Sequence, residues 1–113
     1  MAIPNTTHQA AATAISTLGN YISVHTAPAG TTGASEASGG NYVRIPTTWT
    51  QGTTGLVTGS MVNIPVPAGT YVEGGIFSAV TGGNFVGSGA FAGGNVIVSG
   101  VGASIDITPT ISA

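Results

Sequence analysis

The sequence predicts an all-β protein, an antiparallel β-sandwich of jelly-roll type, with one short N-terminal helix. Two observations carry this prediction. Short runs in which Val, Ile, Tyr and Phe alternate with polar residues make up most of the chain, as in strands with one buried face. Turn-forming Gly, Asn and Pro residues separate these runs. With 113 residues the chain is predicted to form a single domain, with residues 1–19 as a helical segment and residues 20–113 as the β-domain.

The helix is predicted over about residues 6–18, where the sequence is rich in alanine. Residues whose side-chain oxygens can cap a helix precede it: Asn5, Thr6 and Thr7. Residues that often end a helix in the left-handed conformation follow it: Gly19 and Asn20. Four apolar residues recur at helical spacing and predict one packed stripe: Ala11, Ala14, Ile15 and Leu18.

The first strands follow directly. Residues 21–26, "YISVHT", alternate, with Ile22 and Val24 on one face and His25 on the other. Residues 41–50, "NYVRIPTTWT", predict a second strand. In it Val43 and Ile45 lie opposite Tyr42 and Arg44, and Pro46 marks an edge or a bulge.

The second half of the chain predicts the remaining strands. Residues 56–70 contain one or two strands, with Met61, Ile64 and Val66 as their core residues. Further strands are expected in "YVEGGIFSAV", "FVGSGAFAGG", "NVIVSG" and "ASIDITPTIS", with a turn at "TGGN". Gly87 and Gly89, inside one of these strands, indicate a bulge or close backbone packing.

The composition excludes several classes of function. Charged residues make up 4% of the chain, against roughly 25% in an average soluble domain. With a net charge of −2 and Arg44 as the only basic residue besides histidine, the chain has no basic patch for nucleic acid or for a membrane surface. The absence of cysteine rules out disulfides and thiolate metal sites. We expect no signal peptide, because the first residues lack a basic region, and no membrane span. So little charge gives weak repulsion between copies and favours a protein that works in an assembly.

The few groups capable of catalysis are scattered along the sequence. His8 or His25 would need Glu73 or Asp106 and a nearby Ser to form a hydrolytic triad, and no G-x-S-x-G motif is present. No spacing of His and carboxylates is typical of a metal site. We therefore expect no enzyme, no catalytic residue, no cofactor and no metal.

A long loop of small residues, 27–41, separates the first two predicted strands. Glu36 is its only charge, and Arg44 follows it closely, so we expect an ion pair that fixes the path of the loop. We expect the loop to pack against a neighbouring subunit. The candidate interface residues are Ala11, Ile15, Leu18, Glu36, Tyr42, Arg44 and Trp49. Exposed aromatics on a β-surface would alternatively stack on sugars.

The order of these motifs resembles small virion proteins of tailed phages, especially those infecting actinobacteria. The segments that carry the resemblance are "GTTGASE" at residues 30–36, "GGNYVR" at 39–44 and "VEGGIFSAVTGGNFVGSGAF" at 72–91, and it covers nearly the whole chain. Asp-Pro-Gly often follows the His-Thr-Ala of this family. Here residues 27–30 read "APAG", which puts a role for that acidic position in doubt, but not the fold.

The resemblance implies a structural protein of the virion, since members are described as head fibre, capsid decoration or tail fibre proteins. With no shaft repeat and no second domain, we expect a decoration protein on the capsid surface, bound to the major capsid protein. A tail-fibre or baseplate module at the tail tip, bound to tail proteins and with or without glycan binding, is the alternative. In both cases we expect self-association as a homotrimer or another small cyclic oligomer.

Overall fold

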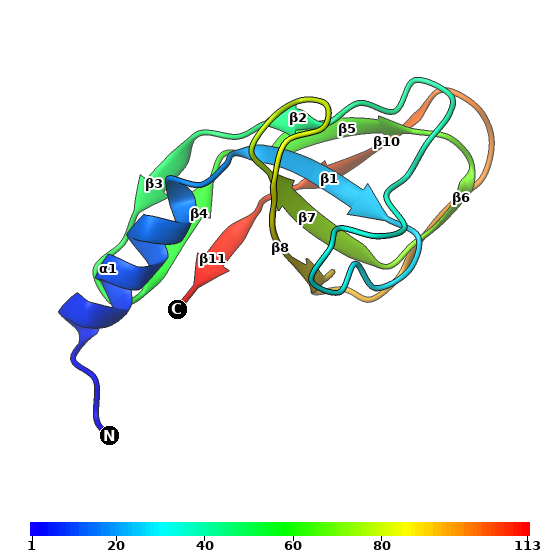
Figure 1. Cartoon of the computed structure of the whole chain (residues 1–113). Coiled ribbons are helices and arrows are strands. Elements are labelled where there is room, and N and C mark those ends of the chain that lie inside the picture. Colours follow the sequence, from blue (N-terminus) through cyan, green and yellow to red (C-terminus); the bar gives the residue numbers. More distant parts are fainter.

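The computed structural model describes residues 1–113 and confirms the all-β class, because short antiparallel strands and one helix make up its regular structure (Figure 1). In chain order the elements are α1 (Asn5–Ser16), β1 (Tyr21–His25), β2 (Ile45–Pro46), β3 (Trp49–Gln51), β4 (Leu56–Gly59), β5 (Val62–Val66), β6 (Gly69–Tyr71), β7 (Glu73–Phe77), β8 (Phe85–Ala90), β9 (Val96–Val98), β10 (Ala103–Ile107) and β11 (Thr110–Ser112). The helix is too short to cross a bilayer.

The molecule is elongated, with extents of 47 × 27 × 24 Å. Figure 1 shows α1 beside β3, β4 and β11 at one end, which we call the helical lobe. The other strands form the sandwich lobe at the opposite end. Both chain ends lie at the helical lobe, whereas the long connection between β1 and β2 wraps around the far end of the sandwich lobe.

The sandwich lobe packs a four-stranded sheet, in the order β2-β1-β7-β8, on the paired strands β5 and β10. Ile22 and Val24 of β1 meet Ile64 and Val66 of β5 in the main core, and Tyr71 closes it. Strand β1 is buried on both faces, because the long loop covers the side that carries His25. The central strand is thus shielded by a sheet on one face and by a loop on the other.

The helical lobe has a smaller core of Ala12, Val57 and Ile111, formed where α1 lies on the sheet β11-β4-β3. Trp49 and Ile76 pack against both cores. The indole Nε1 of Trp49 also donates a hydrogen bond of 3.0 Å to the Gly19 carbonyl oxygen. These contacts join the two lobes.

The ends of α1 differ from those predicted. Pro4 stands at the N-cap, and no side chain caps the free N–H groups, so the predicted Asn or Thr cap is wrong. Thr17 ends the helix in the right-handed conformation rather than a left-handed Gly19. Gly19 is needed for a different reason, because a Cβ there would collide with the Phe77 backbone.

The packed face of α1 is also rotated from the predicted stripe. Ala12 is fully buried and Ile15 packs beside it, whereas Ala11, Ala14 and Leu18 are exposed. In a helix with so many alanines, several faces are equally apolar, and the sheet beneath selects among them.

Two predictions about the strands are wrong. Residues 41–50 do not form one strand, because residues 41–44 lie outside the sheet and only the short strands β2 and β3 follow. Met61 is 65% exposed, and Val62 begins the buried face of β5 in its place. Side chains two residues apart share a face, so Ile64 and Val66 belong with Val62 and not with Met61.

The strands predicted in the second half of the chain are confirmed as β7 to β11. The bulge predicted near Gly87 is also present, as a register shift in the pairing of β7 with β8. Close packing at Gly87 and Gly89 is absent, because no atom lies within 4 Å of a Cβ built at either position.

Truncating Ile64 should test the corrected register of β5. Ile64→Ala leaves a cavity in the main core and is expected to lower the free energy of unfolding by about 2–4 kcal/mol. Met61→Ala, the matched control, should change it by less than about 0.5 kcal/mol, since Met61 is exposed. Urea denaturation measures both, and an equal loss in the two variants would contradict this register.

Candidate functional site

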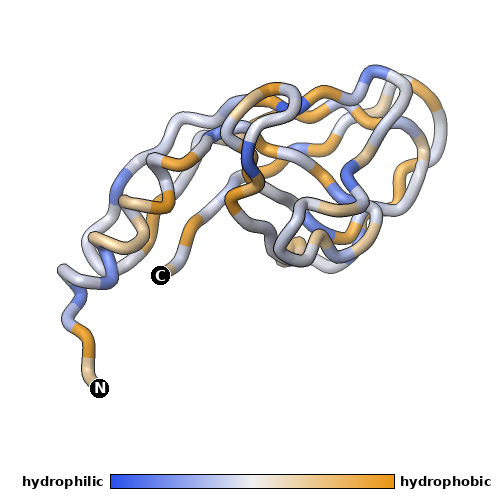
Figure 2. Tube along the Cα trace, in the orientation of Figure 1, coloured by the Kyte–Doolittle hydropathy of each residue, from blue (hydrophilic) through white to orange (hydrophobic).

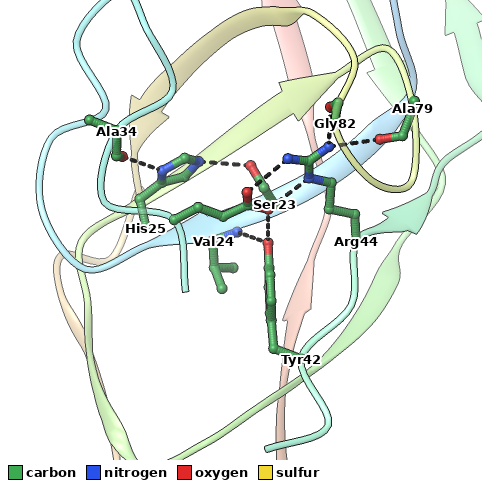
Figure 3. Close-up of polar contacts among 9 residues, drawn as sticks. Ser23, Val24, His25, Ala34, Tyr42, Arg44, Ala79 and Gly82 are labelled. Carbon is green, nitrogen blue, oxygen red and sulfur yellow. Dashed lines mark hydrogen bonds and ion pairs between the residues drawn. The ribbon is translucent and has the colours of Figure 1, made fainter. Parts of the chain in front are cut away.

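The ion pair predicted between Glu36 and Arg44 forms, and it is the centre of a buried polar cluster (Figure 3). Arg44 Nε lies 2.7 Å from Glu36 Oε2, and Arg44 NH2 lies 2.8 Å from Oε1, so the pair is bidentate. The Arg44 side chain is 8% exposed and that of Glu36 22%. Such geometry, largely out of water, makes the contact stronger than a surface ion pair.

The remaining donors of Arg44 hold the turn between β7 and β8. Its NH1 donates to the carbonyl oxygens of Ala79 at 2.9 Å and Gly82 at 2.8 Å. The guanidinium carbon also lies 3.5 Å from the centroid of the Phe77 ring, in a cation–π contact. One side chain therefore ties together the long loop, this turn and the end of β7.

Tyr42 completes the environment of the Glu36 carboxylate. Its hydroxyl donates to Glu36 Oε2 at 2.6 Å. Burial alone would raise the pKa of Glu36, but the hydrogen bonds from Arg44 and Tyr42 outweigh it and hold that pKa below its ordinary value. Burial and the adjoining Glu36 carboxylate raise the pKa of Tyr42 well above its ordinary value. Glu36 is therefore held charged and Tyr42 neutral.

His25 and Ser23 form a second polar pair, fully buried under the loop. His25 Nδ1 lies 2.8 Å from the Ala34 carbonyl oxygen, which can only accept, so Nδ1 carries a hydrogen and donates it. Nε2 and the Ser23 hydroxyl form a second hydrogen bond of 2.8 Å. A Cβ at Gly75 would lie 2.6 Å from Ser23 Oγ, so a glycine is required beneath the pair.

The carboxylates considered for a triad have other partners. Glu73 is opposite His25 in the sheet, but its carboxylate accepts from the Ala29 amide at 3.0 Å and from the Ser88 hydroxyl at 2.9 Å. These bonds, the Ala29 amide foremost, lower the pKa of Glu73. Asp106 accepts from Asn63 on the exposed face of β10. The Ser23–His25 pair thus acts as internal support for the loop.

The long loop is held mainly by its own chain. Main-chain hydrogen bonds join Thr26 to Ser35 and Ala37 to Val24, each at 2.9 Å. The side chains of Ala29 and Ala37 are buried. The Ala29 amide donates to the Glu73 carboxylate, so an acid from β7 fixes this part of the loop. Contacts within the chain therefore explain the path of the loop, and no neighbouring subunit is required to order it.

The candidate interface residues fall into three groups. Glu36, Tyr42 and Arg44 come together in the buried cluster, while Ile15 and Trp49 are half-buried between the helix and the sheets. Ala11 on α1 and Leu18, two residues after the end of α1, are exposed and remain available to a partner.

Sequence reasoning missed several exposed apolar side chains. Ile97 in β9 is 79% exposed, and Val101 in the next turn is fully exposed. Val101 stands between two glycines, which was a signal for a turn. Figure 2 shows another hydrophobic stretch at the N-terminal end, and Ile3, in this part of the chain, is 41% exposed. Uncovered apolar side chains on so uncharged a surface are typical of contacts with other proteins.

An internally locked loop and a weakly charged, partly apolar surface are typical of a protein that packs beside other proteins. A protein-family model described as "Podophage GP4 fiber I protein gp80" matches residues 2–110. The chain therefore belongs to this family of phage fibre-type proteins and is a component of the virion. No curated protein and no solved structure matches it.

Removing one partner of the buried ion pair should destabilise the protein. We expect Glu36→Gln to lower the free energy of unfolding by about 3 kcal/mol, because it leaves the Arg44 guanidinium buried without a counter-charge. Asp106→Asn, which changes an exposed carboxylate, is the matched control and should have little effect. Chemical denaturation of both variants is the measurement, and a loss no larger than that of the control would show that the pair contributes little.

Acid should weaken the fold through the same carboxylates. The folded-state pKa of Glu36 and of Glu73 lies below the ordinary value of 4.5. Their contribution is therefore fully present above about pH 4.5 and is lost as the pH falls through the lower folded pKa. Urea titrations between pH 7 and pH 3 should show a smaller acid-induced loss in Glu36→Gln than in Asp106→Asn. Identical pH profiles in the two variants would contradict this assignment.

Proposed function

We propose that this chain is the repeating subunit of a fibre on the phage particle and self-associates as a homotrimer or another small cyclic oligomer. The family match is the observation that carries this proposal. The elongated shape, the scarcity of charge and the uncovered apolar side chains support it. In such an assembly neighbouring copies cover surface that would make a free monomer adhesive.

The outer face of α1 is the contact surface that we favour in the helical lobe. Ala11 lies on this face and Leu18 follows two residues after the end of the helix; both are exposed, and α1 contains no Asp, Glu, Lys or Arg. Small side chains let another backbone approach closely, and Leu18 supplies apolar area to bury. Ile15, which packs inward, would support this face from beneath.

A glycan-binding platform is less well supported than a protein contact. Every Tyr and Trp side chain is buried or half-buried. The candidate aromatics also have internal partners, since Tyr42 donates to Glu36 and Trp49 to Gly19. Host attachment through such a fibre would therefore depend on loops and backbone groups rather than on stacking against exposed rings.

A capsid decoration protein is the second candidate, favoured by the absence of any shaft repeat or coiled-coil heptad in the sequence. Such a protein would bind the major capsid protein in the assembled shell and not its free subunits. Binding to the assembled state alone stabilises that state by mass action. Modest contacts would suffice, because many copies act on one shell.

Phage particles that lack this protein should separate the two functions. If it is an attachment fibre, we expect depleted particles to assemble and keep their genome but to adsorb to host cells more slowly. If it decorates the capsid, they should adsorb normally but lose genome at a lower temperature or under milder osmotic shock. Adsorption rates and genome release are measured on the same preparation.

Adding back the purified protein is the control, and it should restore whichever property was lost. The proposal of a structural role fails if the protein is missing from purified wild-type particles, or if depleted particles match wild type in both assays.

A further inference from the structure

The sandwich lobe is open along β8. This strand ends its sheet, and β7 is its only partner. No other main-chain hydrogen bond involves residues 85–90, so the outer edge carries free N–H and C=O groups. Most edge strands are protected by a charge, a proline or a covering segment. The sequence of β8, "FVGSGA", contains neither charge nor proline.

No contact within the chain requires glycine at two positions of β8. Gly87 and Gly89 do not have a positive φ, and nothing lies within 4 Å of a Cβ at either position. Glycine inside a strand costs roughly 0.5–1 kcal/mol relative to alanine. Such glycines often mark a bulge or the close approach of another backbone or a ligand; Gly87 adjoins the bulge of β8, whereas no group of this chain approaches Gly89.

Beside these glycines the structure has a cleft of about 270 Å³. Gly87 and Gly89 belong to the side of the sheet that faces the core, because their partners in β7 are Ile76 and Gly74. The cleft is bounded by apolar side chains from four parts of the chain: Ile22, Ile76, Phe91, Ile107 and Pro109. None of its lining residues is charged.

The free edge of β8 and the apolar cleft beside it together indicate which kind of ligand fits this site. A free strand edge pairs with extended peptide, as in strand addition to a sheet. An apolar cleft kept open by glycines accommodates a hydrophobic side chain of that peptide. The uncharged lining disfavours a charged side chain inside the cleft, because an unpaired charge there would lose its hydration.

We propose that the N-terminal arm of a second copy, residues 1–4, adds to the edge of β8 and inserts Ile3 into this cleft. The arm is exposed and projects from α1 in Figure 1. It carries no charged side chain, and Met1 and Ile3 alternate as in a strand. Pro4 has an extended backbone (φ −69°, ψ 157°), and it ends the pairing because it lacks an N–H.

Arm and cleft are different surfaces, so the contact is heterologous. A series of such contacts closes into a ring when the rotation between copies allows it. The inference rests on the proposed self-association and names one of its contacts. Other extended, uncharged peptides could also occupy this site, and the test distinguishes them from the arm.

Sedimentation equilibrium of the purified full chain tests the contact from both sides. We expect Ile3→Asp and Gly89→Val each to weaken self-association at least tenfold, the first by placing a charge on the arm and the second by filling the cleft. Met61→Asp and Gly93→Val are the matched controls. The first alters an exposed apolar residue and the second an exposed glycine with free space around it, so both should stay within twofold of wild type.

Titration with an acetylated peptide, "MAIPNT", gives a readout that does not depend on the oligomer. We expect the peptide to shift the NMR signals of the Gly87 and Gly89 amides in the Ile3→Asp protein. In a protein that also carries Gly89→Val, we expect the peptide to cause no shift at positions 87 and 89. The inference is overturned if the peptide causes no shifts at millimolar concentration, or if both arm and cleft variants associate like wild type. In the second case the proposed self-association would still stand. Equal shifts with a peptide that carries Asp in place of Ile3 would show a nonspecific edge and overturn the role of the arm.

Discussion

The chain has one arginine and no lysine, and much of its structure depends on where that guanidinium lies. Arg44 is nearly buried, and the Glu36 carboxylate, two carbonyl oxygens and the Phe77 ring surround it. Because a buried cation is tolerated only with such partners, each segment that provides one is fixed in place. The loop of small residues thereby becomes a defined surface and covers the second face of β1.

The small number of charged side chains also determines the properties of the protein surface. With its basic side chain used internally, the protein has almost no electrostatic means of keeping copies apart or of attracting an anionic partner. What remains outside is backbone, hydroxyls, alanine and scattered apolar side chains. Such a surface favours contacts based on shape and main-chain hydrogen bonds, which suits a component that is assembled once and stays in place.

The sequence predicted the fold class, the later strands and the ion pair, because these depend on local alternation and on residues close in the chain. It did not predict which face of α1 packs inward, since alanine lies on several faces and the sheet makes the choice. Met61 was mistaken for a core residue because apolar residues stand next to each other at positions 61 and 62. The burial of Ser23 and His25 depends on a loop whose path follows from contacts far apart in sequence. Gly87 and Gly89 were recognised as unusual, but their free surroundings are visible only in three dimensions.

Trp49 is the only tryptophan of the chain, and it stands where the two lobes meet, hydrogen-bonded to Gly19 and packed against both cores. The protein therefore contains a single tryptophan fluorophore, and it lies at the structural joint. Its emission wavelength reports the polarity and hydration of that joint without any label. A rearrangement of the helix against the sandwich on entering a particle would be recorded as a spectral change from a single site.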